Sequence, residues 1–167
     1  VPGPPEQLRV EKRDITTGAL VAAFDGDGIV LSNPSTGPDY YFDIAIDSTY
    51  LYLAGVDFVG TAYRWRIEKR SLSSGALATA FDTDGIVISA SNDEIAYGIA
   101  IDATALYVVG YDRNGTGPTS QWRIEKRNLT TGALVAGFGA GGVAVSDTAG
   151  IREEAFAVAI HRTGLYV

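Results

Sequence analysis

The sequence contains no cysteine, no methionine and only one histidine, His161. Without cysteine the chain forms no disulfide, holds no metal through thiolates and has no cysteine nucleophile. One histidine cannot build a multi-histidine zinc site, and no local motif such as Gly-x-Ser-x-Gly indicates a serine hydrolase. We expect His161 to be an ordinary surface residue in a turn.

Basic residues and long apolar runs are also scarce. The chain has 13 Lys and Arg against 20 Asp and Glu, a formal net charge of −7, which argues against nucleic-acid partners. No apolar run approaches the roughly 20 residues of a membrane helix, and so we expect no membrane insertion. No phosphate-binding loop or dinucleotide fingerprint appears. Hydrophobic residues make up 46% of the chain, which predicts a globular domain with a sizeable core.

What the sequence does contain is an internal repeat. The stretches LRVEKRDITTGAL, WRIEKRSLSSGAL and WRIEKRNLTTGAL begin at positions 8, 65 and 122, a spacing of 57 residues. Each unit contains four strand-like runs, A to D, and no segment has a helical period. Along the chain the order is C, D, then A, B, C, D twice, and finally A, B, which makes twelve strands.

Units of this kind predict an all-β fold, a β-propeller or part of one, with four-stranded antiparallel blades. A Pro-rich linker at 1–7 precedes units at approximately 8–64, 65–121 and 122–167, about three blades' worth in circularly permuted strand order. A β-solenoid and a two-sheet sandwich are the alternatives. Since closed propellers have about four to eight blades, we expect the chain not to close by itself. Its partners are then further blades of the same longer chain or another subunit.

Strand C alternates apolar and charged residues. The alternation predicts that Trp65 and Trp122 are buried between blades. Arg66, Glu68 and Arg70 would then form a solvated or self-paired row on the opposite face of the strand.

Acidic residues gather in the turns and loops. Two pairs in Gly-rich turns are weak candidates for Ca²⁺, the one cofactor that the sequence suggests: Asp25 with Asp27, and Asp82 with Asp84. The third unit has Gly139 and Gly141 instead, which favours ordinary turn residues. Four acidic loop residues are interpreted as a solvated rim and not as a glycosidase pair: Asp93, Glu94, Glu153 and Glu154. Asn114 and Asn128 match the glycosylation sequon, and we interpret both as turn residues.

The connections D–A and B–C differ in length between units, whereas A–B and C–D are constant. In an up-and-down sheet the two variable connections leave on the same side, and such loops often form the binding face. The candidate ligand contacts are therefore Tyr40, Tyr41, Phe58, Tyr63, Asp93, Tyr111, Arg113 and Arg152.

The third unit also resembles a known repeat. Its residues Arg127, Gly132, Leu134, Phe138, Gly139, Gly141 and Gly142, followed by the run Ala157 to Ile160, are similar to the bacterial delta-60 type repeat. The first two units match less well, with FDGDG and FDTDG in place of FGAGG. The resemblance implies a propeller in a secreted or cell-surface protein, and it brings no catalytic residue.

These observations predict a non-enzymatic binding or scaffolding module of an exported or cell-surface prokaryotic protein, with a protein or polysaccharide ligand. The alternative is a carbohydrate-active enzyme, a hydrolase or lyase, on a propeller platform. The largely interchangeable units favour the first reading, because an enzyme is expected to break its repeat with convergent polar residues at one mouth.

Overall fold

The structure is a computed structural model that describes residues 7–35, 37–90, 93–113, 120–146 and 151–167. The linker predicted at 1–7 lies outside these ranges except for Gln7, and so does the Asn114 sequon. The protein is all-β, as predicted: the described residues contain no helix, and hence no helix long and apolar enough to span a membrane.

Twelve strands follow one another along the described chain, at the positions that the repeat predicts. The strands are β1 (Leu8–Glu11), β2 (Ile29–Ser32), β3 (Tyr40–Ile46), β4 (Tyr50–Val59), β5 (Ala62–Ser71), β6 (Ile86–Ile88), β7 (Ile95–Ile101), β8 (Ala105–Asp112), β9 (Gln121–Asn128), β10 (Val143–Ser146), β11 (Ala159–His161) and β12 (Gly164–Tyr166).

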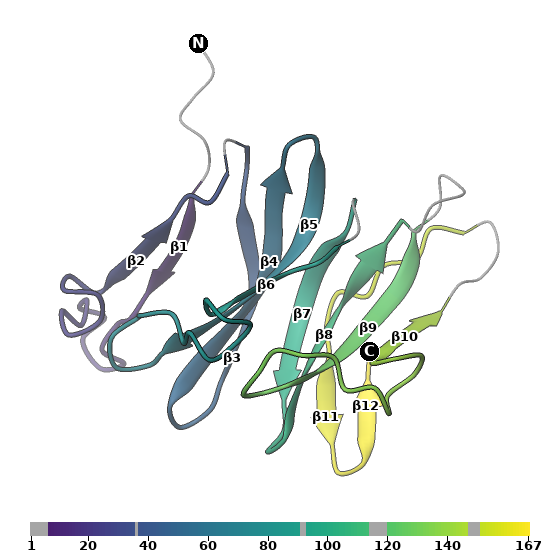
Figure 1. Cartoon of the computed structure of the whole chain (residues 1–167). Coiled ribbons are helices and arrows are strands. Elements are labelled where there is room, and N and C mark those ends of the chain that lie inside the picture. The colour runs from purple at the N-terminus through teal and green to yellow at the C-terminus, as the bar shows by residue number, and fades with distance from the viewer. Residues whose placement is uncertain (1–6, 36, 91–92, 114–119, 147–150) are drawn as a thin grey trace.

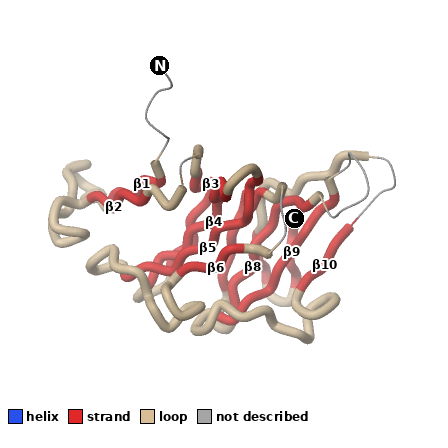
Figure 2. The backbone as a smooth tube through the Cα atoms, turned by 45° about the horizontal axis from the view of Figure 1, so that its top comes forward, coloured by secondary structure: helices blue, strands red, loops and turns tan. Residues whose placement is uncertain are grey.

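The strands form two complete sheets between two half-sheets. The orders β3-β4-β5-β6 and β7-β8-β9-β10 make four-stranded antiparallel sheets, whereas β1 pairs with β2 and β11 pairs with β12. Figure 1 shows the sheets side by side, with the two half-sheets at opposite ends of the array. The tube in Figure 2 shows strands joined by loops and turns. The described strands form a row of sheets and not a closed ring.

Two apolar cores hold the row together. One lies between the complete sheets and is centred on Trp65, Ile67 and Phe81, and the other joins the first half-sheet to β4 through Val10 and Phe24. The first half-sheet and the first complete sheet thus each present an apolar face to the sheet that follows. A sheet of four short strands cannot bury both faces alone, and stacking against neighbours removes them from water.

Backbone contacts repeat at the first two junctions of the row. Asp25 N donates to Ser74 O and Asp82 N donates to Thr131 O, both at 3.0 Å, from one sheet to the next. Gly75 is in the left-handed region, at φ +75°, and a Cβ there would lie 2.7 Å from Val30, so the turn requires glycine.

The prediction for the two tryptophans is half correct. Trp65 is 1% exposed and its Nε1 donates to Tyr111 O at 3.1 Å. Trp122, at the same position of β9, is only partly buried, and the prediction for it was wrong. The reason is its place in the row: Trp65 faces a complete sheet, whereas β9 faces a half-sheet.

Candidate functional site: buried ion pairs and an aromatic strip

The charged row on β5 is paired and almost completely buried. Glu68, which solvent does not reach, accepts hydrogen bonds from Arg66 Nε and Arg70 Nε, each at 2.6 Å. Arg70 also donates to Gly75 O at 2.9 Å, which ties the strand to the turn that follows it. The row lies on the opposite face from Trp65, as predicted, and of the two predicted states it is self-paired and not solvated.

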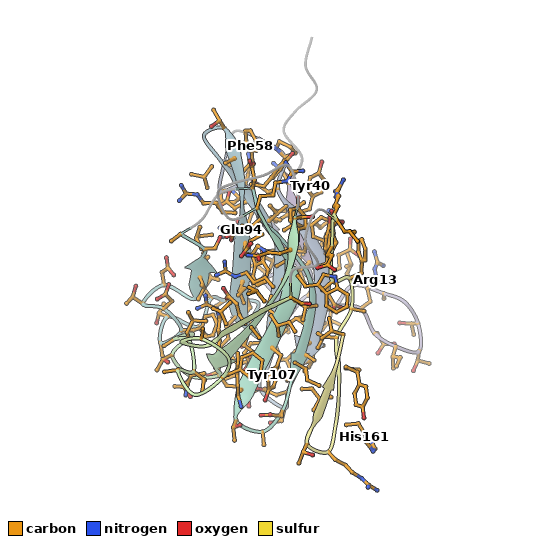
Figure 3. All side chains as sticks on the ribbon, turned by 90° about the vertical axis from the view of Figure 1, so that its right-hand side faces the viewer. Arg13, Tyr40, Phe58, Glu94, Tyr107 and His161 are labelled. Carbon is orange, nitrogen blue, oxygen red and sulfur yellow. The ribbon has the colours of Figure 1, made fainter. Side chains whose placement is uncertain are left out.

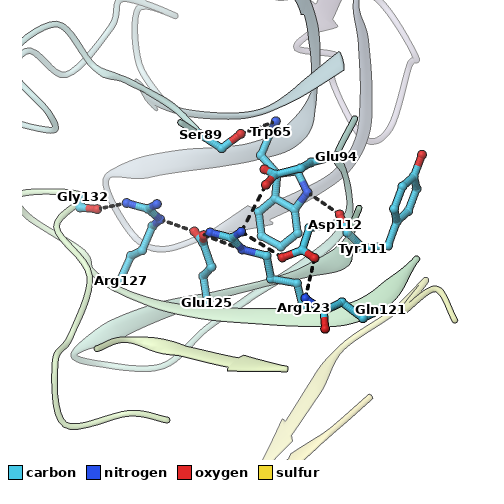
Figure 4. Close-up of polar contacts among 10 residues, drawn as sticks. All are labelled: Trp65, Ser89, Glu94, Tyr111, Asp112, Gln121, Arg123, Glu125, Arg127 and Gly132. Carbon is cyan, nitrogen blue, oxygen red and sulfur yellow. Dashed lines mark hydrogen bonds and ion pairs between the residues drawn. The ribbon is translucent and has the colours of Figure 1, made fainter. Parts of the chain in front are cut away.

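The same row recurs on β9, against the face of the preceding sheet (Figure 4). Glu125 accepts from Arg123 at 2.5 Å and from Arg127 at 2.7 Å, and Arg123 also contacts Glu94 and Asp112, each at 3.1 Å. The guanidinium of Arg123 lies 5.3 Å from the centre of the Trp65 ring.

Glu94 corrects one sequence interpretation. It was read as part of a solvated rim, but its exposed fraction is 0% and its partner is Arg123. Glu153 and Glu154 are half-buried and Asp93 is exposed. Glu94 is inside because its neighbours supply an arginine, and a buried carboxylate with a charged partner costs far less than an unpaired one.

These arginines are held in their charged state. Although burial opposes it, Glu68 raises the pKa of Arg66 above its usual value, and Glu125 and Glu94 do the same for Arg123. Each guanidinium therefore stays a permanent partner of its carboxylates. Paired in this way and largely withdrawn from solvent, the two arginines tie strands and loops together.

Two buried carboxyl groups, those of Asp39 and Asp57, lie beside the charged row on β5. Asp39 Oδ1 accepts from Ser35 Oγ and Phe58 N, and Asp57 Oδ2 accepts from Arg66 at 3.2 Å. The exposed fractions of Asp39 and Asp57 are 1% and 6%. Burial raises the pKa of Asp57, the cation of Arg66 opposes the rise, and Asp39 adds to it. The nearby carboxyl group of Asp39 thus adds to the effect of burial in disfavouring the ionised form of Asp57.

In the first unit the equivalent row is open to solvent. Glu11 accepts from Arg9 Nε and Arg13 Nε, each at 2.6 Å, but the side chains of both arginines are about half exposed. The sequence of the row is thus the same in all units, and its burial depends on whether another sheet covers it.

The calcium candidates act as turn residues in the structure. Asp27 Oδ1 accepts from Ile29 N and Asp84 Oδ1 accepts from Ile86 N, both at 2.8 Å. Asp25 and Asp82 adopt positive φ angles. Within the described ranges no group of three or more acidic or histidine side chains is placed to hold a metal ion.

The predicted ligand contacts lie at one end of the sheets. Figure 3 shows Tyr40 and Phe58 at this end, far from Tyr107 and His161. The rings of Phe58 and Tyr63 meet edge to face, with centroids 5.1 Å apart. The eight candidates differ in exposure, and this limits which of them a ligand can reach: Tyr40, Asp93, Arg113 and Arg152 are exposed, Tyr41, Phe58 and Tyr63 are half-buried, and Tyr111 is buried at 6%.

An aromatic strip, Tyr40–Phe42–Tyr97–Phe156, crosses the first strands of the two complete sheets and the segment before β11. Ring centroids are 6.0 Å apart for Tyr40 and Phe42, 5.2 Å for Phe42 and Tyr97, and 4.9 Å for Tyr97 and Phe156. Phe42 is 45% exposed and Phe156 is 65% exposed. Exposed apolar surface of this kind makes the strip a candidate binding surface.

Sequence reasoning named Tyr40 but missed the rest of this strip and the Asp39–Asp57 pair. The signal was present at other spacings. Phe42 and Tyr97 are 55 residues apart and Tyr97 and Phe156 are 59 apart, because the connections between strands differ in length. A search at the single period of 57 residues does not align them.

His161 ends β11 and is exposed, as expected for a turn residue. It takes the position of Asp47 and Asp102, each of which accepts two backbone N–H bonds in its turn and a bond from a tyrosine hydroxyl.

Comparison of the chain with protein-family models, with curated proteins and with solved structures found no match.

Proposed function

We propose that the chain is a non-enzymatic binding module of an exported or cell-surface repeat protein, built from propeller blades, and that its ligand is a polysaccharide. The aromatic strip carries this proposal. Flat aromatic faces pack against the apolar faces of sugar rings, and a row of rings at 4.9 to 6.0 Å suits an extended chain. Arg152, exposed and within the predicted binding loops, adds a hydrogen-bond donor near Phe156.

The distribution of charge supports binding over catalysis. Within the described residues, the best-placed acids, Glu68, Glu94 and Glu125, are each engaged with arginine and have no exposed surface. The rows on β5 and β9 share the pairing of two arginines with one glutamate and of the first arginine with an aspartate, which fits a structural role.

The alternative is a carbohydrate-active enzyme, and one observation favours it. Asp39 and Asp57 are adjacent carboxyl groups with different environments, as in acid–base pairs. Their burial argues against it, because a sugar cannot reach side chains that are 1% and 6% exposed. Release of reducing ends from a bound polysaccharide, abolished by Asp57→Asn, would support the enzyme.

The test is depletion of the chain from solution by insoluble cellulose, chitin, xylan and peptidoglycan. Leucine keeps the volume and apolar character of a ring but removes its flat face, so the double variant F42L/F156L should bind about tenfold more weakly. Ser48→Ala, at the opposite end of the sheets, should bind as the parent does. If none of the four materials removes the chain from solution, the proposal of a polysaccharide ligand is refuted.

A further inference from the structure

The N-terminal end of the row exposes an apolar residue, Ile15, at a position that is packed against a core in the other units. Its side chain is 102% exposed, whereas Leu72 and Leu129, at the same position of the next units, pack against the two cores. Gly18 has open space where a Cβ at Gly75 would meet the ring of a buried phenylalanine. This end therefore lacks the neighbour that its equivalents have.

Strand β3 has the same contrast. Ile44 and Ile46 are 46% and 55% exposed, although Ile99, the equivalent of Ile44, is 4% exposed. Two cavities of about 260 and 250 Å³ lie between β1 and this face of β3 and β4. They occupy the place that strands A and B hold in a complete sheet, and β1–β2 has no such strands.

The C-terminal end of the row also exposes residues whose equivalents are buried. Tyr166 is 61% exposed, whereas the equivalent Tyr52 is 1% exposed. Lys69 Nζ donates to Leu129 O at 2.6 Å, but Lys126 makes no such bond within the described residues and only lies 5.2 Å from the ring centre of Tyr107. A cavity of about 300 Å³ beside Lys126 lies where an equivalent of Leu129 would pack.

The two free strand edges fit in register. Among the described strands, β1 pairs only with β2 and β12 pairs only with β11. In the complete sheets Leu106 pairs with Arg127, Tyr107 with Lys126 and Val108 with Glu125. The same pattern would place three consecutive pairs along β12 and β1: Leu165 with Arg13, Tyr166 with Lys12 and Val167 with Glu11. It would also bring Lys12 over the ring of Tyr166, as Lys69 lies over that of Tyr52.

We propose that two copies of this chain associate head to tail, with the β11–β12 hairpin of each completing the β1–β2 half-sheet of the other. One copy cannot satisfy its own edges, because its half-sheets are at opposite ends of the row (Figure 1). Each copy contributes two complete sheets and one sheet shared with its partner, so two copies make six. Six lies within the range of about four to eight at which blades close into a ring, whereas three copies would make nine.

The contacts of this dimer follow from the repeat. Lys126 Nζ of one copy donates to Ile15 O of the other, and Phe138 packs over Gly18. Phe156 of one copy meets Phe42 of the other, so the aromatic strip continues across the junction. Dimerisation goes beyond the proposed ligand binding, and its test uses residues outside the aromatic strip.

The test is sedimentation velocity and light scattering of the 167-residue chain over a wide concentration range. The expected mass is twice 17.6 kDa. Ile15→Asp should give a folded monomer, because the side chain makes no apolar contact within one copy. Val59→Asp is the matched control: Val59 is an exposed apolar residue outside both end surfaces, and this variant should remain dimeric. Circular dichroism checks that each variant is folded.

A mixing experiment tests the head-to-tail arrangement. Ile15→Asp disables the N-terminal surface and Tyr166→Asp disables the C-terminal surface, so each alone should be monomeric. An equimolar mixture retains one intact junction and should form heterodimers. Failure of the mixture to associate would refute this arrangement.

Two further results would overturn the proposal. A parent chain that stays monomeric at all concentrations would leave the edges to further repeats of the same pattern. A parent chain that forms larger, open assemblies would exclude the closed dimer. Polysaccharide binding by the Ile15→Asp monomer would show that ligand binding does not require the dimer, so failure of one proposal can be told from failure of the other.

Discussion

Lys69 reaches from one sheet to the next: its Nζ donates to the carbonyl oxygen of Leu129, 60 residues later, at 2.6 Å. The same ammonium group lies 4.1 Å from the ring centre of Tyr50 and 5.4 Å from that of Tyr52. Burial lowers the pKa of Lys69, and the carboxylate of Asp47 opposes this. Lys12 makes the equivalent bond to Leu72 O at 2.8 Å. One lysine in each of the first two units therefore links neighbouring sheets.

Replacement of Lys69 by methionine should destabilise the protein. The variant keeps the apolar stem but leaves Leu129 O without its charged donor, which should cost about 1–2 kcal/mol in free energy of unfolding. Urea titration of the monomeric Ile15→Asp background measures this. Lys126→Met in the same background is the control and should have little effect. Equal losses in the two variants would mean that the bond to Leu129 contributes nothing.

Removal of Glu68 should be the most damaging change in the charged rows. Glu68→Ala leaves Arg66 and Arg70 buried without their shared partner, a loss of about 3–5 kcal/mol in free energy of unfolding. Glu11→Ala makes the same chemical change in the first unit, where the row is exposed, and should be nearly silent in the monomer. Urea denaturation of both variants in the Ile15→Asp background provides the comparison. Similar effects at the two positions would contradict a role for burial.

The Asp39–Asp57 pair should make the protein more stable in mild acid than it would be without the pair. The folded-state pKa of Asp57 lies above the unfolded value of 3.8, so the folded state holds the proton more tightly. This contribution is complete below the unfolded pKa and is lost as pH rises through the folded pKa. Asp57→Asn should remove this pH dependence. Urea titrations of parent and variant at pH 4 and pH 7 measure it, and parallel changes in both proteins would refute it.

The contribution of Asp102 to stability should change with pH in the opposite direction. Although partial burial opposes it, hydrogen bonds from Thr104, Ala105 and Tyr107 lower its pKa to about 2. Its contribution to stability is present above the unfolded pKa of 3.8 and is lost as pH falls toward 2. Because the side chain is only partly buried, Asp102→Ala should cost only about 1 kcal/mol at neutral pH. Thermal melts between pH 2 and pH 5 should show a shallower acid loss for the variant.

The sequence predicted much of this architecture, because the repeat carries it. Glu11, Glu68 and Glu125 are in register along the chain, and the strands around them follow the alternation of Trp65, Arg66 and Ile67. Burial was harder to predict, because it depends on what covers a residue and not on the residue itself. Trp122 and Trp65 have the same local sequence and different neighbours. Glu94 reads as a loop acid until the arginine that faces it is known.

The candidate site was less predictable than the fold. The rings of Phe42 and Phe156 are linked through the ring of Tyr97, which lies between them. Because the loops differ in length from unit to unit, these equivalent residues are not evenly spaced along the chain. The order of strands can be read locally, but the approach of side chains from different units is a tertiary property.

The two tryptophans lie in different surroundings, and this gives the protein a pair of built-in optical probes. Trp65 is enclosed at the middle of the row with its indole N–H bonded to Tyr111 O, whereas Trp122 is partly open near one end. A sheet at the end of a row of stacked units has fewer neighbours and is expected to open first. In the monomeric Ile15→Asp background, the fluorescence of Trp122 in a Trp65→Phe variant should therefore report fraying of the end of the array, and that of Trp65 in a Trp122→Phe variant should report melting of its centre.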